Sequence, residues 1–230
     1  MESQNYEAAM TQTVLITGSN RGIGLSLSQL YKSKAWNVIA LCRSKSEALE
    51  ALNVEVHTGM DVSSPDIAGQ LTDILKDRPL DLLINNAGIL RNEVLGTIDY
   101  KQVQEQWEVN TLGPLRVAEA CLKNLKAGSK IAMITSRMGS IADNSSGGRY
   151  GYRMSKAALN MASASLAADL KTKEVPVGIY HPGLVGTDMI GGKGNLTPEE
   201  AAESLHNLID GLNLENSGSF WHINGENLAW

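Results

Sequence analysis

The strongest constraint on the fold is a regular alternation of short apolar runs with longer stretches of helical periodicity. The runs expected to form strands, rich in β-branched and other apolar residues, are 13–17, 37–41, 54–58, 80–85, 130–135, 175–180 and 219–223. The stretches expected to form helices are 22–34, 65–76, 100–126, 152–171 and 197–210. Parallel strands require crossovers, and helices usually make them. The sequence therefore predicts an α/β fold: one doubly wound, parallel, seven-stranded sheet with helices on both faces.

Local chemistry sets expectations for where the helices begin and break. Ser63 and Ser64 are candidate N-caps for the helix over 65–76. Thr197 is the expected N-cap of the last helix, and Pro198 lies in its first turn. Pro114 falls inside the long 100–126 stretch, where its missing N–H is expected to kink or break the helix.

Length and composition narrow the class of protein. The chain has 230 residues, of which 43% are hydrophobic and 20% are charged, as in ordinary globular domains. We expect a flexible polar arm over 1–10 and a single domain over 11–230, without a separate substrate domain. The first ten residues contain two Glu and no basic leader segment, and no apolar run approaches the roughly 18 residues of a membrane span. A cytoplasmic protein without a membrane partner is expected.

Charge and cysteine usage exclude further classes. The formal net charge is −5, so the molecule as a whole is not suited to neutralising nucleic-acid phosphates. Cys42 and Cys121 are far apart and form no CxxC pair, and the four His residues show no ligand spacing. No metal site is expected, and two buried thiols fit a reducing compartment.

A glycine-rich loop follows the first predicted strand. It has the sequence TGSNRGIG over 17–24 and opens into a helix. Gly18 would allow a tight turn, Gly22 would let the backbone approach a pyrophosphate, and Gly24 would let the helix pack closely on the strand. The helix N-terminus would offer free N–H groups to phosphates. The spacing is neither G-x-G-x-x-G nor a P-loop, so the loop by itself leaves open an ordinary turn without a ligand.

The residues after the second strand bear on the ribose of a dinucleotide. NAD sites usually place Asp or Glu there, about 20 residues after the glycine loop. Here the sequence is CRSK over 42–45, with no acid before Glu47. Arg43 would make a charge-assisted fork to a 2′-phosphate, and Arg21 in the glycine loop would add a second cation. The pattern favours NADP(H) over NAD(H), the alternative being two solvated surface arginines.

Tyr152 and Lys156 are four residues apart on a predicted helix and therefore share a face. A phenol titrates near pH 10, and a neighbouring ammonium would lower its pKa toward the range useful for acid–base catalysis. Tyr150 has Met154 at the corresponding position and so lacks a Lys partner. Ser136 follows the fifth strand at the same predicted edge, where its hydroxyl would polarise a carbonyl oxygen. Each feature alone is compatible with an ordinary surface or turn residue.

Taken in order along the chain, the motifs resemble those of the short-chain dehydrogenase/reductase family. The matching segments are 17–24 (TGSNRGIG), Asp61-Val62, Asn85–Gly88 (NNAG), Asn110, Ser136, Tyr152-x3-Lys156 and Pro182-Gly183-x3-Thr187. The resemblance covers roughly residues 11–190. Within the family, the segment 136–141 (SRMGSI) and the Trp-terminated tail resemble the C-factor and Sniffer-type carbonyl reductase branch.

The resemblance implies a Rossmann-type fold and a role for each matching residue. Asp61 would bind the adenine amine, Asn86 would border the adenosine ribose, and Asn110 would hold a water in a proton relay through Lys156. Pro182, Gly183, Val185 and Thr187 would frame the nicotinamide. The implied catalytic residues are Asn110, Ser136, Tyr152 and Lys156. The expected cofactor-binding residues are Gly18, Asn20, Arg21, Gly22, Ile23, Gly24, Arg43, Asp61, Val62, Asn86, Ala87, Gly88, Tyr152, Lys156, Pro182, Gly183, Val185 and Thr187.

Two departures from the family pattern concern the substrate side. Ser136 and Tyr152 are 16 residues apart, slightly more than is common in the family, so the loop between them is expected to differ locally. The segment 188–196 is short for a substrate lid, which predicts an open pocket. The glycine-rich stretches 139–151 and 186–194 are expected to be mobile.

The resulting hypothesis is an NADPH-dependent reductase that converts a carbonyl of a small molecule (a ketone, an aldehyde or a quinone-like compound) to an alcohol. Two alternatives stay open: a nucleotide-binding signalling or regulatory protein with little catalysis, and an NADP+-dependent alcohol dehydrogenase using the same site in reverse. The two long helices, 100–126 and 152–171, resemble those that form homodimers or homotetramers in the family. Small residues on the second helix would permit close packing, although burial against the chain's own sheet would equally require them.

Overall fold

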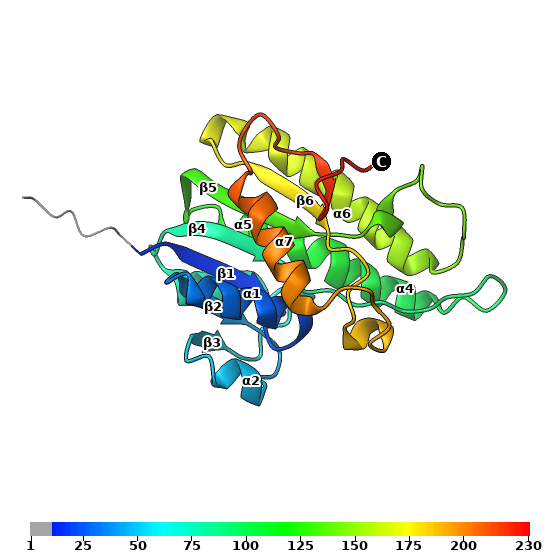
Figure 1. The fold of residues 1–230 in the computed structure, drawn as a ribbon, viewed down its shortest axis with the longest axis horizontal. Coiled ribbons are helices and arrows are strands. Elements are labelled where there is room, and N and C mark those ends of the chain that lie inside the picture. Colours follow the sequence, from blue (N-terminus) through cyan, green and yellow to red (C-terminus); the bar gives the residue numbers. More distant parts are fainter. Residues whose placement is uncertain (1–10) are drawn as a thin grey trace, which may run out of the picture.

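The computed structural model describes residues 11–230 and shows a sheet between two layers of helices (Figure 1). The strand order is β3-β2-β1-β4-β5-β6-β7, and every neighbouring pair is parallel. Because the order reverses beside β1, the chain winds outward in both directions from the centre. The predicted fold class is confirmed. The expected polar arm over 1–10 lies outside the described residues.

Most predicted elements are present with small shifts at their ends. The strands are β1 (Thr13–Thr17), β2 (Asn37–Leu41), β3 (Glu55–His57), β4 (Leu80–Asn85), β5 (Leu125–Ile134), β6 (Val177–His181) and β7 (Phe220–His222). The α-helices are α1 (Gly22–Ser33), α2 (Glu47–Glu50), α3 (Ile67–Leu75), α4 (Tyr100–Trp107), α5 (Gly113–Cys121), α6 (Tyr150–Asp169) and α7 (Pro198–Asp210). A π-helix, η1 (Glu108–Leu112), joins α4 to α5. Short 3₁₀ turns are η2 (Arg137–Gly139), η3 (Lys171–Lys173) and η4 (Asp188–Ile190).

Successive side chains of the central strands point to opposite helix layers. On β1, Val14 and Ile16 pack in the core with α1 and α7, whereas Leu15 packs with α3, α5 and α6. All three side chains are completely buried. A strand covered on both faces cannot alternate apolar with polar residues, and this accounts for the continuous apolar runs in the sequence.

The predicted helical stretch over 100–126 is present in part: it is interrupted by a π-helix next to Pro114, and it ends at Cys121. The chain leaves the helical conformation after Cys121 and enters β5 at Leu125. Pro114 does not end the helical stretch; it lies in the first turn of α5, a position where proline is common. The irregularity lies just before it, in the π-helix, where the Gly113 N–H donates to the Glu108 carbonyl.

The N-cap predictions had different outcomes. Thr197 caps α7 in a capping box with Glu200, as expected. Ser63 and Ser64 do not cap α3, which starts at Ile67 after Asp66. The Ser63 hydroxyl donates to the Asp61 carboxylate at 2.7 Å, and the Ser64 hydroxyl accepts from the Asp66 N–H, so both serve the turn that precedes the helix. The short helix α2 was not predicted, because four residues are too few to show periodicity.

The carboxyl ends of β1, β2, β4, β5 and β6 meet at one edge of the sheet. The loops that leave them include the glycine-rich loop and the segments that carry most other predicted site residues. This is the edge where open α/β sheets bind ligands. Across residues 11–230, no helix is both long and apolar enough to cross a membrane.

Candidate active site

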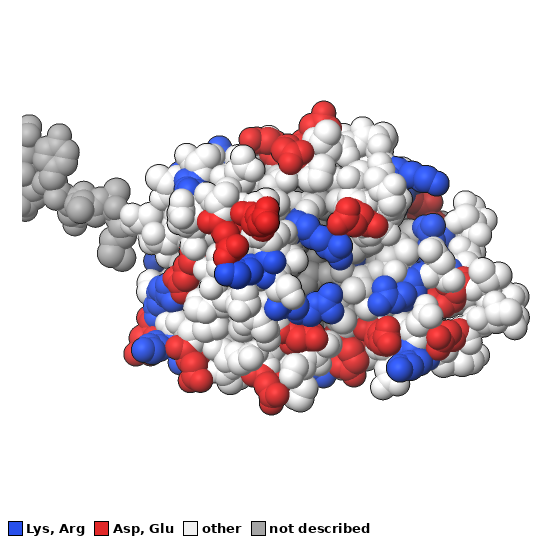
Figure 2. All heavy atoms as spheres, turned by 90° about the horizontal axis from the view of Figure 1, so that it is seen from below, with Lys and Arg blue, Asp and Glu red and all other residues white. Residues whose placement is uncertain are grey.

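A cavity of about 1000 Å³ opens at the carboxyl edge of the sheet and runs from the end of β2 to the start of α6. Figure 2 shows one face of the molecule with acidic and basic side chains intermixed and several basic ones around a hollow. The predicted site residues that line the cavity are Gly18, Asn20, Arg21, Gly22, Ile23, Arg43, Asp61, Val62, Asn86, Ala87, Gly88, Tyr152, Lys156, Pro182 and Thr187. The predicted residues outside its lining are Gly24, Asn110, Ser136, Gly183 and Val185.

The glycine loop is fixed by close backbone contacts. Gly18 has a φ of 69°, in the left-handed region that favours glycine. A Cβ on Gly24 would lie 2.2 Å from the Gly18 carbonyl oxygen, so only glycine lets α1 start this close to β1. The Asn86 side-chain amide donates to the Thr17 carbonyl at 3.0 Å, and the Thr17 hydroxyl accepts from the Asn86 and Ala87 N–H groups. These bonds join the loops after β1 and β4 into one cradle.

Arg43 and Asp61 line the end of the cavity beside β2. The Asp61 carboxylate accepts from both the N–H and the hydroxyl of Ser63. These bonds, the side-chain one foremost, hold the pKa of Asp61 below its usual range, and the charge of Arg43 lowers it further. Sequence reasoning missed Ser44 and Ser46, which also line this end. Their position directly after a strand at the ligand-binding edge was the available signal.

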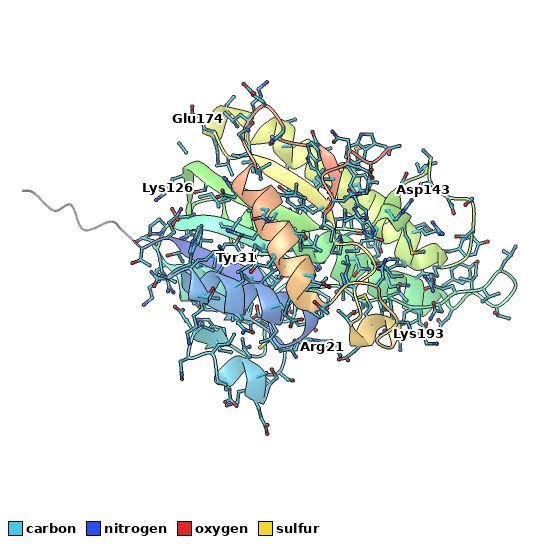
Figure 3. The ribbon with its side chains drawn as sticks, in the orientation of Figure 1. Arg21, Tyr31, Lys126, Asp143, Glu174 and Lys193 are labelled. Atoms are coloured by element: carbon cyan, nitrogen blue, oxygen red, sulfur yellow. The ribbon has the colours of Figure 1, made fainter. Side chains whose placement is uncertain are left out.

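Arg21 does not point freely into the cavity. Its guanidinium forms an ion pair with Asp188 at 3.1 Å, with both side chains largely exposed. Arg21 at the start of α1 and Lys193 in the loop before α7 lie at the same side of the molecule (Figure 3). A Cβ on Gly22 would lie 3.1 Å from the Thr187 methyl carbon. The short 188–196 segment therefore lies against the glycine loop rather than only bordering a substrate pocket.

Tyr152 and Ser136 come together at the other end of the cavity. Tyr152 lies in the first turn of α6, and Ser136 follows β5; both side chains are buried. Burial raises the pKa of Tyr152, while a hydrogen bond with Ser136 and the charge of Arg149 oppose that rise. The expectation of a lowered phenol pKa is therefore not met in this structure. Desolvation of the phenolate outweighs the two stabilising interactions.

Lys156 is buried one helical turn after Tyr152. Its ammonium donates to the Ile134 carbonyl at 3.0 Å and lies 5.9 Å from the centroid of the Tyr152 ring. It therefore lies over the ring face instead of pairing with a carboxylate. Burial lowers the pKa of Lys156 to about 8. A Cβ on Gly88 would lie 3.7 Å from the Lys156 Nζ, so the loop after β4 also faces this amine.

The Asn110 side chain is occupied by protein groups. Its Oδ1 accepts from the Ile89 N–H and its Nδ2 donates to the Ile89 carbonyl, both at 2.8 Å. Nδ2 also donates to the Ser155 hydroxyl at 3.0 Å. The main-chain carbonyl of Asn110 has no α-helical donor, because Pro114 lacks an N–H.

The residues after β6 divide into two groups. Pro182 and Thr187 line the cavity. Val185 bridges to Leu196, and a Cβ on Gly183 would lie 2.8 Å from the Leu196 side chain. Gly183 and Val185 thus fix the loop, while their neighbours face the cavity.

The lining fits an elongated dinucleotide. The cavity volume is at the upper end of the range for ligand pockets, as a two-ring ligand requires. The glycine cradle leaves room for phosphates at the start of α1, where backbone N–H groups are free. Arg43 and Asp61 stand at one end, and Tyr152 and Lys156 at the other. Among residues 11–230, no three His, Cys, Asp or Glu side chains are grouped to hold a metal.

Comparison with known proteins identifies the family. A family model described as short chain dehydrogenase matches residues 12–195. The 1-hydroxy-2-glutathionyl-2-methyl-3-butene dehydrogenase of Rhodococcus sp. (strain AD45) is 40% identical over 224 residues, which are 95% of this chain and 99% of that protein. The C-signal protein of Myxococcus xanthus is 44% identical over 155 residues, which are 66% of this chain and 93% of that protein. The chain belongs to the short-chain dehydrogenase/reductase family.

Solved structures of carbonyl reductases in that family are similar to this chain. The carbonyl reductase Sniffer of D. melanogaster has a TM-score of 0.87 and 31% identity, covering 96% of this chain and 100% of that one. The NADPH-bound carbonyl reductase from chicken fatty liver has a TM-score of 0.86 and 30% identity, with coverage of 96% and 99%. The predicted relationship to C-factor and Sniffer-type proteins is confirmed, and the chain is an oxidoreductase.

The depressed pKa of Lys156 predicts a pH-dependent stability. Its pKa is about 8 in the folded chain against an ordinary 10.5, so the unfolded chain binds more protons between these values. The free energy of unfolding therefore rises with pH across this window, by at most about 1.4 kcal/mol per pH unit for one group. In Lys156→Met this contribution is absent. Urea unfolding of both proteins without cofactor, followed by Trp fluorescence, should show the wild-type stability rising relative to the variant from pH 8 to 10; a constant difference would contradict the burial of a titrating amine.

Proposed function

We propose that this protein catalyses the NADPH-dependent reduction of a carbonyl to an alcohol. One observation carries the proposal: the buried phenol of Tyr152 interacts with the buried Ser136 hydroxyl beside the buried amine of Lys156, at one end of a cavity sized for a dinucleotide. Two hydroxyl donors that converge in a desolvated site suit a carbonyl oxygen that gains negative charge. When bound, the nicotinamide supplies the hydride.

Each side chain takes a distinct part in this reaction. Ser136 and Tyr152 bind the carbonyl oxygen, and Tyr152 donates the proton that completes the alcohol. Because burial raises its pKa, Tyr152 is protonated at neutral pH and starts as a general acid. Lys156 binds the cofactor ribose. Its positive charge near the phenol stabilises the phenolate that is left after Tyr152 has donated its proton. The Asn110 main-chain carbonyl would hold the water that returns protons from solvent through Lys156.

Arg43 supports a preference for NADP(H). It lines the cavity at the end of β2, and no acidic residue stands between Leu41 and Ser46 to repel a 2′-phosphate. Arg21 would join it only by giving up or sharing its ion pair with Asp188. Asp61 would accept from the adenine amine, and its low pKa keeps it ionised as an acceptor. Asn86 would border the adenosine ribose.

Two other functions use the same residues differently. The Rhodococcus relative is named as a dehydrogenase, which supports NADP+-dependent alcohol oxidation as the reverse use of this site. The Myxococcus relative is named C-signal, which supports the signalling or regulatory alternative. A protein that only binds a nucleotide has no need of Ser136 and Tyr152 converging beside Lys156, so the site favours catalysis.

A panel of aldehydes, ketones and quinones, assayed with NADPH and NADH in parallel, tests this function. We expect oxidation of NADPH with at least one carbonyl class, and at least about tenfold lower kcat/KM with NADH, the scale of one charge-assisted hydrogen bond. Arg43→Asp should reverse this preference by repelling the 2′-phosphate. An unchanged preference in the variant would refute the role of Arg43, and no turnover with any carbonyl would favour the regulatory alternative.

We further propose that two copies associate through α4 and α6. Tyr100 and Trp107 are exposed seven residues apart on α4, and Met154 and Met161 are exposed seven residues apart on α6. A seven-residue spacing keeps each pair on one helix face, and α4 packs beside α6. The alanines expected on α6 (Ala157, Ala158, Ala162, Ala164 and Ala168) are half-buried or exposed, so packing on the sheet does not bury them completely.

The free, buried Cys42 and Cys121 agree with a reducing compartment such as the cytoplasm.

This association predicts a dimer or a tetramer in sedimentation velocity at micromolar concentration. Met161→Glu places a charge in the apolar face, far along α6 from Tyr152, and should shift the protein to a monomer while leaving its fold intact. Circular dichroism of the variant checks the fold. A wild-type protein that sediments as a monomer would contradict the proposed interface.

A further inference from the structure

Arg149 has an unusual backbone at the start of α6. Its φ and ψ are 50° and 46°, and Gly147 and Gly148 before it also have positive φ. Three consecutive residues are therefore left-handed, and only the third carries a side chain. A non-glycine residue in this conformation costs roughly 1 kcal/mol and persists where surrounding contacts impose it, often at functional sites. The backbone conformation therefore fixes the direction in which the Arg149 side chain leaves the main chain. Arg149 lies two residues before Gly151 and three before Tyr152.

Two loops hold this residue. The Arg149 N–H donates to the Glu93 carbonyl at 3.0 Å, and its Nε donates to the Asn92 Oδ1 at 2.9 Å. Its Nη1 contacts the Met138 sulfur at 3.7 Å. Figure 1 shows the 91–98 and 139–149 loops extending from the same end of the molecule. The guanidinium is thereby held between the segment after β4 and Met138, which lies two residues after Ser136.

The loop that holds Arg149 is itself anchored. The Gln106 side-chain carbonyl accepts from the Arg91 N–H at 2.8 Å, and its amide donates to the Glu93 carboxylate. Glu93 and Gln106 are buried, and a Cβ on Gly151 would lie 2.9 Å from the Glu93 Oε1. The Glu93 carboxylate is therefore turned inward against α6 and forms no ion pair with Arg149. A preorganised cation of this kind loses little entropy when it binds an anion.

Arg149 also differs from the neighbouring arginines in its charge partners. Arg137 pairs with Asp143, and Arg91 pairs with Glu105. Arg153 donates to main-chain carbonyls of the loop. Within the described part of the chain, Arg149 has no carboxylate partner, and its Nη2 makes no hydrogen bond. Its charge reaches the active site, because it lowers the pKa of Tyr152.

We propose that Arg149 binds a carboxylate of the substrate whose carbonyl lies at Ser136 and Tyr152. The substrate class is then an oxo-acid: an aldehyde or ketone that carries its carboxylate a few bonds from the reacting carbon. Guanidinium and carboxylate form paired, charge-assisted hydrogen bonds, and Arg149 has donors left for this contact. This inference rests on the proposed reductase function and assigns the specificity of the same site.

The test compares 4-formylbenzoate with its methyl ester, which presents the same aldehyde without the charge. The wild-type enzyme with NADPH should have the higher kcat/KM for the acid. Arg149→Gln keeps a polar side chain in the same backbone position and should lower the acid-to-ester ratio about tenfold, as expected for one charge-assisted hydrogen bond at an open site. Any change in ester turnover reports the loss of the Arg149 charge near Tyr152, which acts on both substrates and cancels in the ratio. Circular dichroism shows whether the variant is folded.

Matched variants separate local contact from overall charge. Lys171→Gln removes one positive charge in the turn that follows the far end of α6 and should leave the ratio unchanged. Arg149→Lys keeps the charge and should retain part of the preference. A ratio that is the same in wild type and Arg149→Gln, or that falls equally in Lys171→Gln, would overturn the inference.

A binding measurement keeps this test independent of catalysis. Ligand-observed NMR of 4-methylbenzoate and 4-methylbenzamide, each with the enzyme and NADP+, needs no turnover. Binding of the carboxylate that weakens in Arg149→Gln, while the amide is unaffected, would support the anion site even if neither aldehyde were reduced. Equal binding of the carboxylate by both proteins would overturn it. Absence of turnover alone would count against the proposed reductase function and not against the Arg149 contact.

Discussion

The burial of the Lys156 amine is the interaction on which the site depends. An ammonium removed from water needs compensating partners, and here it receives the Ile134 carbonyl and the face of the Tyr152 ring. These contacts tie the end of β5 to the first turns of α6. A Cβ on Gly139 would lie 2.7 Å from the Lys156 carbonyl carbon, so the turn after Ser136 rests directly on the helix backbone. The hydroxyl pair and the amine are thus placed together by main-chain packing, not by side-chain flexibility.

Close main-chain packing also shapes the part of the cavity beside β1 and β4. Gly24 lets α1 start against β1, and the Asn86 amide fills the gap between the loops after β1 and β4. The loops after β1 to β6 then converge on one cavity, so the glycine loop, Tyr152 and Lys156 all lie at the same edge of the sheet. Arg21 and Asp188 add an exposed link across that cradle. Exposed ion pairs contribute little to stability, so this link can rearrange at little cost.

The sequence predicted the sheet well because its strands are buried on both faces. The bounds of β1, β2 and β4 match the predicted runs residue by residue. Helix ends were less predictable. The hydrophobic periodicity of the sequence showed neither the end of the helix at Cys121 nor the π-helix before Pro114. The Ser63 hydroxyl could serve Asp61 or a helix cap, and only the folded loop decides between them.

The candidate site was likewise predictable from the sequence only in part. Residues in motifs of fixed spacing, such as Gly18, Gly22 and Lys156, line the cavity as expected. Gly183 and Val185 instead pack on Leu196. Leu196 is not part of their sequence motif, so the spacing of the motif residues does not predict this contact. The direction of the Tyr152 pKa depended on burial, which sequence does not give. Arg149 lies in a loop whose left-handed backbone and partners appear only in three dimensions.

The central claim is that Tyr152 transfers the proton in a hydride-transfer reaction, and the Tyr152→Phe variant tests it most directly. With the best carbonyl and NADPH, this variant should lose about 10²–10⁴-fold in kcat, the usual contribution of a positioned acid. NADPH should still bind with nearly unchanged Kd, because the phenol oxygen is not needed to hold the dinucleotide. Tyr150→Phe, two residues earlier in α6, should retain wild-type turnover. Near-wild-type kcat in Tyr152→Phe would contradict the account.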